Sequence, residues 1–295
     1  MNRIPPRRTS DDSGDPPKLL VYGNGWGLME LPKLPRERSW TFEERLDRLA
    51  EAKFAGLQAD TKYADAVRAR GLRFCNSGRA NTPADVDGIV AAAADVAADC
   101  LTLHVGWGME DDAEVDALVD GILNASHRRN VPVYIETHRA TITQDLWRTG
   151  ELTRRIPEVR FNADLSHYYC AAEMVYQGFD TTINYLEPIL QRTNFIHGRI
   201  SNGQSMQVDV GDGIDDKHAR NFARAWRRGM EHWLRGAGRG DVLIFAPELG
   251  PPSSGYSLTY RGSEGTLVEI SDRWEQSLVL KRMAEQAFAD AVGSL

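Results

Sequence analysis

The feature that most constrains the fold of this chain is an alternation of short apolar runs with longer amphipathic stretches. The runs are near-continuous in hydrophobic residues, and they lie at 19–23, 56–60, 72–77, 100–106, 131–138, 159–167, 194–201 and 241–249. Strands buried on both faces of a parallel sheet have this character. Their alternation with helical segments indicates an α/β fold.

The amphipathic stretches between these runs carry recognisable helix starts. Thr41 is followed three residues later by Glu44, which is the pattern of a capping box. Thr82 stands directly before Pro83, and this order suits an N-cap residue and a first helical position. The expected helices begin at 41 and span 61–70, 82–98, 112–129, 143–155, 179–192, 216–236 and 272–292.

These units predict one (β/α)₈ barrel, the TIM barrel. The chain has 295 residues, and such a barrel needs about 250. An open doubly wound sheet is the alternative, but it rarely needs so many units, and segment 23–27 lacks the third glycine of a GxGxxG motif. We expect a disordered tail at 1–17, rich in proline and serine, and a single barrel domain at 18–295. The loops at 202–215 and 250–271 are long and are expected to set specificity.

Composition narrows the classes of partner. The net charge is −7, whereas proteins that bind nucleic acid usually present a basic face. The three cysteines form no CxxC pair, as expected of a reducing compartment. No apolar run reaches the roughly 20 residues that span a bilayer, and the first residues lack the apolar region of a secretory signal. We therefore expect a cytoplasmic protein with neither nucleic-acid nor membrane partners.

Acidic or imidazole side chains end four consecutive strands of the predicted barrel: Glu136, Asp164, His197 and Glu248. The carboxyl ends of barrel strands open onto one face, so these side chains should converge. Three carboxylates in one place repel one another unless a cation lies between them. A lone acid at a strand end often caps a helix or pairs with arginine, but the coincidence over four strands favours a metal site. Its oxygen-rich donors suit Mn²⁺, Mg²⁺ or Co²⁺, and Zn²⁺ also fits.

Other side chains near the strand ends are candidates for contact with a substrate. His138 is a candidate base, and packing is the alternative role for it and for His167. The aromatic candidates would pack on the apolar face of a sugar ring, or simply fill loops. The predicted substrate-binding set is His104, Trp107, His167, Arg199, Trp26 and Tyr256.

At these positions the chain resembles the xylose isomerase-like barrel superfamily, which includes sugar isomerases and epimerases and related dehydratases and endonucleases. The resemblance implies that Glu136, Asp164, His197 and Glu248 are the ligands of one metal ion. It also implies that His167, three residues after Asp164, meets the substrate.

Three departures affect the reaction that the resemblance implies. Arg199 follows His197 more closely than the corresponding arginine does in the epimerases. Glu136 and His138 are spaced as in bacterial 3-dehydroshikimate dehydratases, where that histidine is a proposed base. Asn76 stands where the endonuclease branch has a histidine ligand, so DNA repair is disfavoured.

The leading hypothesis is a divalent-metal-dependent isomerase or epimerase that acts on a sugar or keto-sugar through an enediolate, with Glu136 and Glu248 as acid and base. The alternative is a metal-dependent lyase or dehydratase, resembling 3-dehydroshikimate dehydratase or cleaving 3-keto-glycosides, with His138 as base. A third is a sugar-binding barrel, or a subunit of a larger complex, with a vestigial metal site. The expected partner is a small polyhydroxylated molecule, without phosphate because no Lys/Arg cluster stands out. A homo-oligomer is expected by resemblance only.

Overall fold

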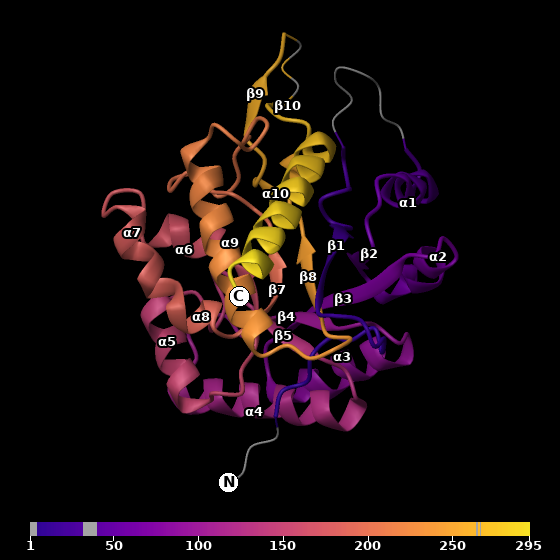
Figure 1. The fold of residues 1–295 in the computed structure, drawn as a ribbon, viewed down its shortest axis with the longest axis vertical. Helices are drawn as coiled ribbons and strands as arrows, with labels where there is room; N and C mark the ends of the chain where they lie inside the picture. The colour runs from indigo at the N-terminus through magenta and orange to yellow at the C-terminus, as the bar shows by residue number, and fades with distance from the viewer. Residues whose placement is uncertain (1–4, 32–39, 264, 266) are drawn as a thin grey trace.

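The computed structural model contains a closed barrel of eight parallel strands in the order of the sequence, β1 to β8 (Figure 1). It describes residues 5–31, 40–263, 265 and 267–295. The predicted (β/α)₈ barrel is therefore confirmed. The strands are β1 (Lys18–Asn24), β2 (Gly56–Ala59), β3 (Arg73–Ala80), β4 (Leu101–Val105), β5 (Val133–Glu136), β6 (Phe161–Asp164), β7 (Thr193–His197) and β8 (Val242–Ala246).

Helices surround the barrel, and in Figure 1 the early ones lie to the right and the middle ones to the left. Both predicted helix starts are confirmed, because α1 has the Thr41–Glu44 capping box and α3 begins at Pro83. The helices are α1 (Phe42–Glu51), η1 (Thr61–Tyr63), α2 (Ala64–Arg68), α3 (Pro83–Asp95), α4 (Asp112–Arg129), α5 (Leu146–Arg155), α6 (Ser166–Ala171), α7 (Phe179–Thr182), η2 (Ile183–Leu186), α8 (Glu187–Leu190), α9 (Lys217–Arg235), η3 (Pro252–Ser254) and α10 (Arg273–Gly293).

One expected helix is broken. The stretch 179–192 was expected as one helix, but it forms α7, η2 and α8 in succession. Pro188 lies in the first turn of α8, where it lacks the N–H that a continuous helix would use. Several strands are also shorter than the apolar runs that predicted them, because buried loop residues extend those runs beyond the hydrogen-bonded ladder.

The N-terminal segment corrects a second expectation, that of a disordered tail at 1–17. Residues 1–4 lie outside the described residues, but the remainder packs across the floor of the barrel. Thr9 is fully buried, and its backbone N–H donates to the Tyr134 hydroxyl at 2.8 Å. Ser10 bridges Asp241 beside β8, and its carbonyl accepts from Arg73 at 3.2 Å. These buried polar contacts fix a segment whose composition alone suggests disorder.

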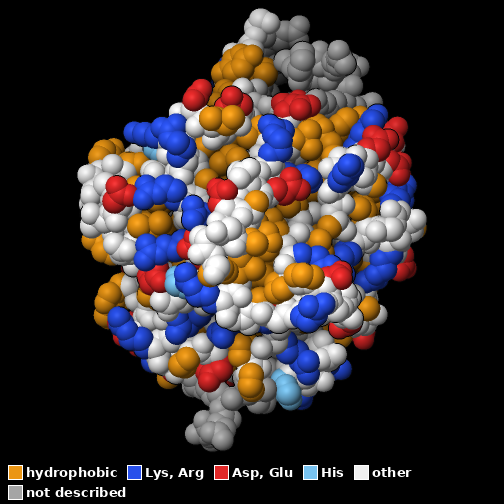
Figure 2. All heavy atoms as spheres, in the orientation of Figure 1, with side chains coloured by type: hydrophobic (Ala, Val, Ile, Leu, Met, Phe, Trp, Pro, Cys, Tyr) orange, Lys and Arg blue, Asp and Glu red, His pale blue; other side chains and the backbone are white. Residues whose placement is uncertain are grey.

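The outer surface carries mixed charge. On the face formed by α9 and α10, basic, acidic and apolar side chains lie interspersed (Figure 2). Many of the arginines there have acidic partners, such as Arg224 with Asp180 and Arg228 with Glu187. Within the described residues, no helix combines the length and apolarity that crossing a bilayer requires.

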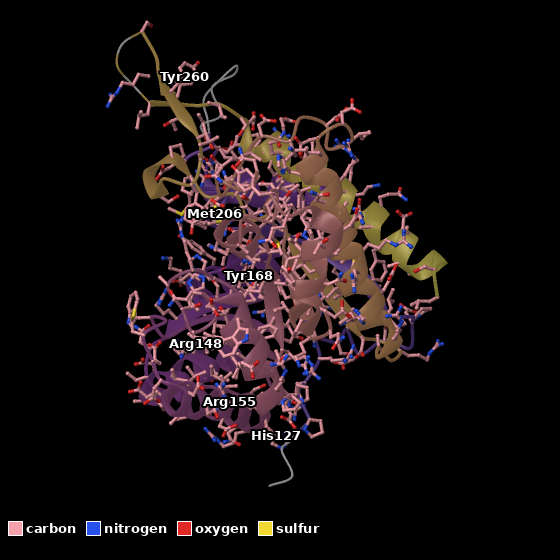
Figure 3. All side chains as sticks on the ribbon, turned by 90° about the vertical axis from the view of Figure 1, so that its left-hand side faces the viewer. His127, Arg148, Arg155, Tyr168, Met206 and Tyr260 are labelled. Carbon is pink, nitrogen blue, oxygen red and sulfur yellow. The ribbon has the colours of Figure 1, made fainter. Side chains whose placement is uncertain are left out.

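The loops at the carboxyl ends of the strands are elaborate. A hairpin of β9 (Thr259–Arg261) and β10 (Leu267–Glu269) projects beyond the body, with Tyr260 at one extreme of the molecule and His127 of α4 near the other (Figure 3). Gln207 ties the two long loops together, because its Oε1 accepts from the Gly250 N–H at 2.7 Å. The loops that should set specificity are thus held as one unit.

Candidate metal centre and active site

The four predicted metal ligands converge at the carboxyl end of the barrel. Glu136, Asp164 and His197 are the last residues of β5, β6 and β7, and Glu248 lies two residues beyond β8. All four are buried, and one donor atom from each lies within 4.8 Å of the others. The parallel register of neighbouring strands, with Asp164 opposite His197, produces this convergence.

His197 lies between two carboxylates. Its Nδ1 is 3.4 Å from Glu136 Oε2 and 3.2 Å from Glu248 Oε2. Burial would lower the pKa of this imidazole, but the charges of Glu248 and Glu136 outweigh burial and raise it to about 10. The proton on His197 therefore neutralises part of the negative charge of the cluster.

Arg199 supplies a second positive charge. Its Nη2 pairs with Asp164 Oδ2 and lies 3.0 Å from Glu248 Oε2. Burial works to raise the pKa of Glu248, but His197 and Arg199 lower it to about 2. Burial raises the pKa of Asp164 to about 6, because Arg199 offsets only part of the cost of desolvation.

The donor set fits a divalent cation. Glu248 Oε2 is buried, and within the described residues it has ion-pair contacts but no aligned hydrogen bond. Three carboxylate groups and one imidazole, with unused lone pairs aimed at one small volume, are the donors that Mg²⁺ and Mn²⁺ accept. One dication together with Arg199 would match the charge of the three carboxylates.

A chain of hydrogen bonds fixes which nitrogen of His197 faces the cluster. The backbone N–H of Gly27 donates to Asn24 Oδ1, so Asn24 presents its amide nitrogen to Gln58 Oε1 at 2.8 Å. Gln58 Nε2 in turn donates to Thr102 Oγ1 at 2.7 Å. His197 Nε2 lies 2.8 Å from Gln58 Oε1, so it must carry the proton, which leaves the Nδ1 lone pair for a metal.

Sequence reasoning missed Gln58 and Asn162. Both are fully buried polar side chains in strands, and Asn162 Nδ2 lies 3.2 Å from Glu136 Oε2 and 3.1 Å from each ring nitrogen of His197. The sequence does contain a signal for both residues, because an amide side chain within an apolar, buried strand must find a hydrogen-bond partner.

Three imidazoles lie in a row beside the cluster, with their rings tilted against one another. The ring centroids of His104 and His138 are 4.3 Å apart, and those of His138 and His167 are 4.0 Å apart. His104 Nε2 lies 2.9 Å from Glu136 Oε1, and the charge of Glu136 raises the pKa of His104 against the effect of burial. His104, Glu136 and His138 form a second group whose donor atoms are close enough to hold a metal.

His138 is held as a neutral base. Its Nδ1 faces the carbonyl of Arg139, which can only accept, so Nδ1 carries the proton. Its Nε2 is left with the lone pair, 3.2 Å from the Tyr256 hydroxyl. Burial lowers the pKa of His138 to about 4.

A cavity of about 760 Å³ opens above the cluster. Among the predicted site residues, Trp26, His104, Glu136, His138, His197 and Glu248 line it. Trp107 does not, and it is 54% exposed at the rim, with the Arg79 guanidinium carbon 4.2 Å from its ring centroid. Tyr256 braces the wall, since its ring packs edge-on against Trp26 with centroids 5.2 Å apart.

The positions of His167 and Arg199 differ from those expected of substrate-binding residues. Both are buried behind the carboxylates, and neither lines the cavity. His167 Nε2 lies 3.5 Å from Asp164 Oδ2 and 3.1 Å from Arg199 Nη2. Burial, reinforced by Arg199, holds the pKa of His167 well below its usual range. Their contacts favour the holding of Asp164 and Glu248 over contact with substrate.

Comparison with known proteins addresses the fold. The chain matches no protein-family model and no curated protein. A xylose isomerase-like TIM barrel protein from Mycobacterium smegmatis, in complex with magnesium, is 12% identical, with a TM-score of 0.55 over 91% of this chain and 97% of that one. An L-ribulose 3-epimerase is 10% identical, with a TM-score of 0.54 over 93% and 96%.

A probable 3-DHS dehydratase from Bacillus anthracis is 11% identical, with a TM-score of 0.50 over 90% of this chain and 97% of that one. At these identities the likeness establishes the fold alone. The chain has the fold of the xylose isomerase-like TIM barrel proteins, so the resemblance read from its sequence is confirmed at that level.

Proposed function

We propose that this chain is a divalent-metal-dependent isomerase or epimerase of a small polyhydroxylated carbonyl compound, such as a keto-sugar. The observation that carries the proposal is the buried cluster of Glu136, Asp164, His197 and Glu248 at the base of an open cavity. A structural cluster of that kind would be closed, whereas this one faces a space large enough for a substrate. The neighbours named for magnesium binding and for epimerisation support this choice.

The proposed chemistry divides between the ion and the protein. A bound divalent ion would polarise a substrate carbonyl and stabilise the negative charge that develops when a carbon-bound proton leaves. Glu136 and Glu248 both line the cavity and are both ionised, because positive neighbours hold the pKa of each below its usual range. Each can accept a proton, so one carboxylate removes the carbon-bound proton. The other takes a proton from water in the open cavity and delivers it to a different face or atom.

A second candidate function is elimination, and the state of His138 favours it. This imidazole lines the cavity, is neutral, and presents an unprotonated Nε2 without serving in the four-residue cluster. A base that the metal does not engage could remove a proton and let a β-hydroxyl or β-alkoxy group depart. That outcome would make the chain a dehydratase or a keto-glycoside lyase.

One experiment separates the two reactions. The Mn²⁺-loaded protein is incubated in D₂O with a panel of keto-sugars, 3-keto-glycosides and 3-dehydroshikimate, and the products are followed by NMR and ultraviolet absorbance. Isomerisation or epimerisation predicts deuterium at carbon with no new chromophore. Elimination predicts a conjugated product that absorbs in the ultraviolet. Deuterium at carbon in no substrate would contradict the isomerase proposal.

Variants assign the roles. Glu248→Gln should abolish turnover in the isomerase case, whereas His138→Asn should abolish it in the lyase case. Glu285→Gln is the matched control, because this exposed α10 carboxylate pairs only with Lys281 among the described residues. Full activity of Glu248→Gln on the true substrate would refute the acid–base assignment.

Metal analysis tests the third hypothesis, a binding protein with a vestigial site. Protein purified without chelator should contain about one equivalent of a divalent metal, as one four-ligand site requires. Asp164→Ala should lower that content. If metal-free protein takes up no Mn²⁺ or Mg²⁺, the proposed metal-dependent chemistry is refuted.

A further inference from the structure

The cavity above the metal cluster is also lined by cations. Three cationic side chains from separate elements line it: Arg45 of α1, Lys62 of η1 and Arg79 of β3. Glu136 and Glu248 of the metal cluster line the same cavity. A single ligand could therefore touch both the cations and the cluster.

Within the described residues, no carboxylate forms an ion pair with any of these three cations. Half-buried arginines elsewhere are of two kinds. Arg73 pairs with Asp99 and Arg155 pairs with Asp116, whereas Arg192 donates to backbone carbonyls. The charges of the three cations that line the cavity are therefore available to a ligand.

The contacts that Arg45, Lys62 and Arg79 make leave N–H groups that can donate to a ligand. Arg79 Nη1 donates to the Gly106 carbonyl at 2.7 Å, and its guanidinium stacks on Trp107. Lys62 Nζ lies 4.9 Å from the Tyr63 ring centroid. Arg45 Nε is buried and has no hydrogen-bond partner among the residues that the structure describes. A buried N–H without a partner costs free energy, and an anion would relieve that cost.

The charge balance of the cavity is also uneven. At the metal end, one dication and Arg199 would match three carboxylates. Apart from Glu136 and Glu248, Asp60 is the acid among the described residues that line the cavity, and its Oδ1 already accepts from the Lys62 backbone N–H. Outside the metal cluster, the described lining of the cavity therefore has three cations and one carboxylate, on a chain whose net charge is −7. A local excess of positive charge in a concave site attracts anions.

We propose that Arg45, Lys62 and Arg79 form a subsite for the anionic group of the substrate, a carboxylate or a phosphate, while its carbonyl end reaches the metal centre. This rests on the proposed function. It revises the expectation of a substrate without phosphate, which depended on seeing no cluster of basic residues in the sequence. The aromatic pair Phe42 and Tyr63, with ring centroids 4.3 Å apart, borders the subsite and would pack on the carbon chain.

The test uses three probes with the same six-carbon polyol chain: sorbitol, gluconate and sorbitol 6-phosphate. Calorimetry measures their binding to the full-length protein loaded with Mg²⁺, at low salt. At least one anionic probe should bind about tenfold or more tighter than sorbitol, as charge-assisted hydrogen bonds predict. The probe that shows the advantage identifies the anion as carboxylate or phosphate.

Variants locate the anion. Lys62→Gln and Arg79→Gln should each lower the affinity for the anionic probe far more than the affinity for sorbitol, and so remove most of the advantage. Lys217→Gln is the control, since this exposed lysine of α9 lies outside the cavity. Equal binding of all three probes, including no binding of any, would overturn the subsite. So would an advantage that survives both variants, because the anion would then bind at the metal or elsewhere.

The result of the binding comparison does not depend on the reaction assays. The comparison measures binding rather than turnover, so a failure to find isomerase activity would leave it readable. Conversely, loss of the anion preference would leave the metal content and the acid–base variants unaffected.

Discussion

Arg199 and Asp164 form an ion pair from which solvent is fully excluded, with both side chains 0% exposed. The same guanidinium nitrogen lies 3.0 Å from Glu248 Oε2. Taking these charges out of water is costly, and removal of one partner leaves the other uncompensated. Arg199 therefore links the stability of the barrel to the charge state of the carboxylates in the candidate metal site.

Arg199→Gln should destabilise the metal-free protein by about 3–5 kcal/mol, because the buried carboxylates of Asp164 and Glu248 would lose their arginine partner. The same change should strengthen metal binding, since no cation then competes for Asp164. Thermal unfolding with and without Mn²⁺ measures both effects, and the metal-induced rise in Tm should be larger in the variant than in the wild type.

The matched control is Arg73→Gln. Arg73 is half-buried and pairs with Asp99 at 2.5 Å, but it lies at the start of β3, at the end of the barrel away from the cluster. It should destabilise the fold without changing the metal-induced rise in Tm. An equal rise in both variants and in the wild type would show that Arg199 does not act through the metal centre.

Metal binding should release a proton at neutral pH. The Glu248 and Glu136 charges raise the pKa of His197 to about 10 against the effect of burial, so its imidazole is protonated at pH 7.5. A metal needs the Nδ1 lone pair and must displace that proton. Asp164, with a pKa of about 6, is already ionised at this pH.

The affinity for a metal should therefore depend on pH. Between pH 7 and pH 9, the apparent affinity should rise by about tenfold per pH unit, because the proton that competes for His197 becomes scarcer. Calorimetry of Mn²⁺ binding at pH 7.5, in two buffers of different ionisation enthalpy, should report the release of about one proton. Heats that do not depend on the buffer would mean that His197 is already neutral or is no ligand.

Gln58 should set metal affinity without touching the metal. Its Oε1 accepts from His197 Nε2 at 2.8 Å and thereby directs Nδ1 toward the cluster. Gln58→Leu should weaken Mn²⁺ binding by about 10- to 100-fold, as loss of such supporting hydrogen bonds does. Gln58→Glu keeps an acceptor oxygen and should retain most of the affinity. Equal weakening by both variants would point to packing rather than to orientation of His197.

The barrel and its metal cluster could be predicted from the sequence because both follow from periodicity. Apolar runs that alternate with helices fix a closed parallel sheet, and a parallel sheet brings all strand ends to one face. Glu136, Asp164 and His197 each stand at the last residue of a strand, so a pattern in one dimension was enough to place them together.

The cationic lining of the cavity could not be predicted in the same way. Arg45, Lys62 and Arg79 come from a helix, a 3₁₀ turn and a strand, with no shared spacing. That all three line one cavity depends on how α1 and η1 pack on the barrel. Its sequence position likewise predicts that Arg199 contacts the substrate, because the sequence does not reveal that this side chain turns inward to Asp164.

The composition of the N-terminal segment predicts a tail, whereas its order comes from contacts with residues far along the chain, one of them with a buried hydroxyl. Tyr134 is 0% exposed, and its hydroxyl contacts both the backbone N–H and the Oγ1 of Thr9, at 2.8 and 2.9 Å. Tyr134→Phe should leave the Thr9 groups without a partner and lower the free energy of unfolding by about 1–3 kcal/mol.

Denaturant unfolding measures the loss, and Thr9→Ala completes a double-mutant cycle whose coupling term should be positive because the two residues are in contact. Limited proteolysis should cut the N-terminal segment of Tyr134→Phe sooner than that of the wild type. Metal content should not change, since the cluster lies at the other end of the barrel. Wild-type unfolding and proteolysis in Tyr134→Phe would show that the segment is held by other contacts, such as the one between Arg73 and Ser10.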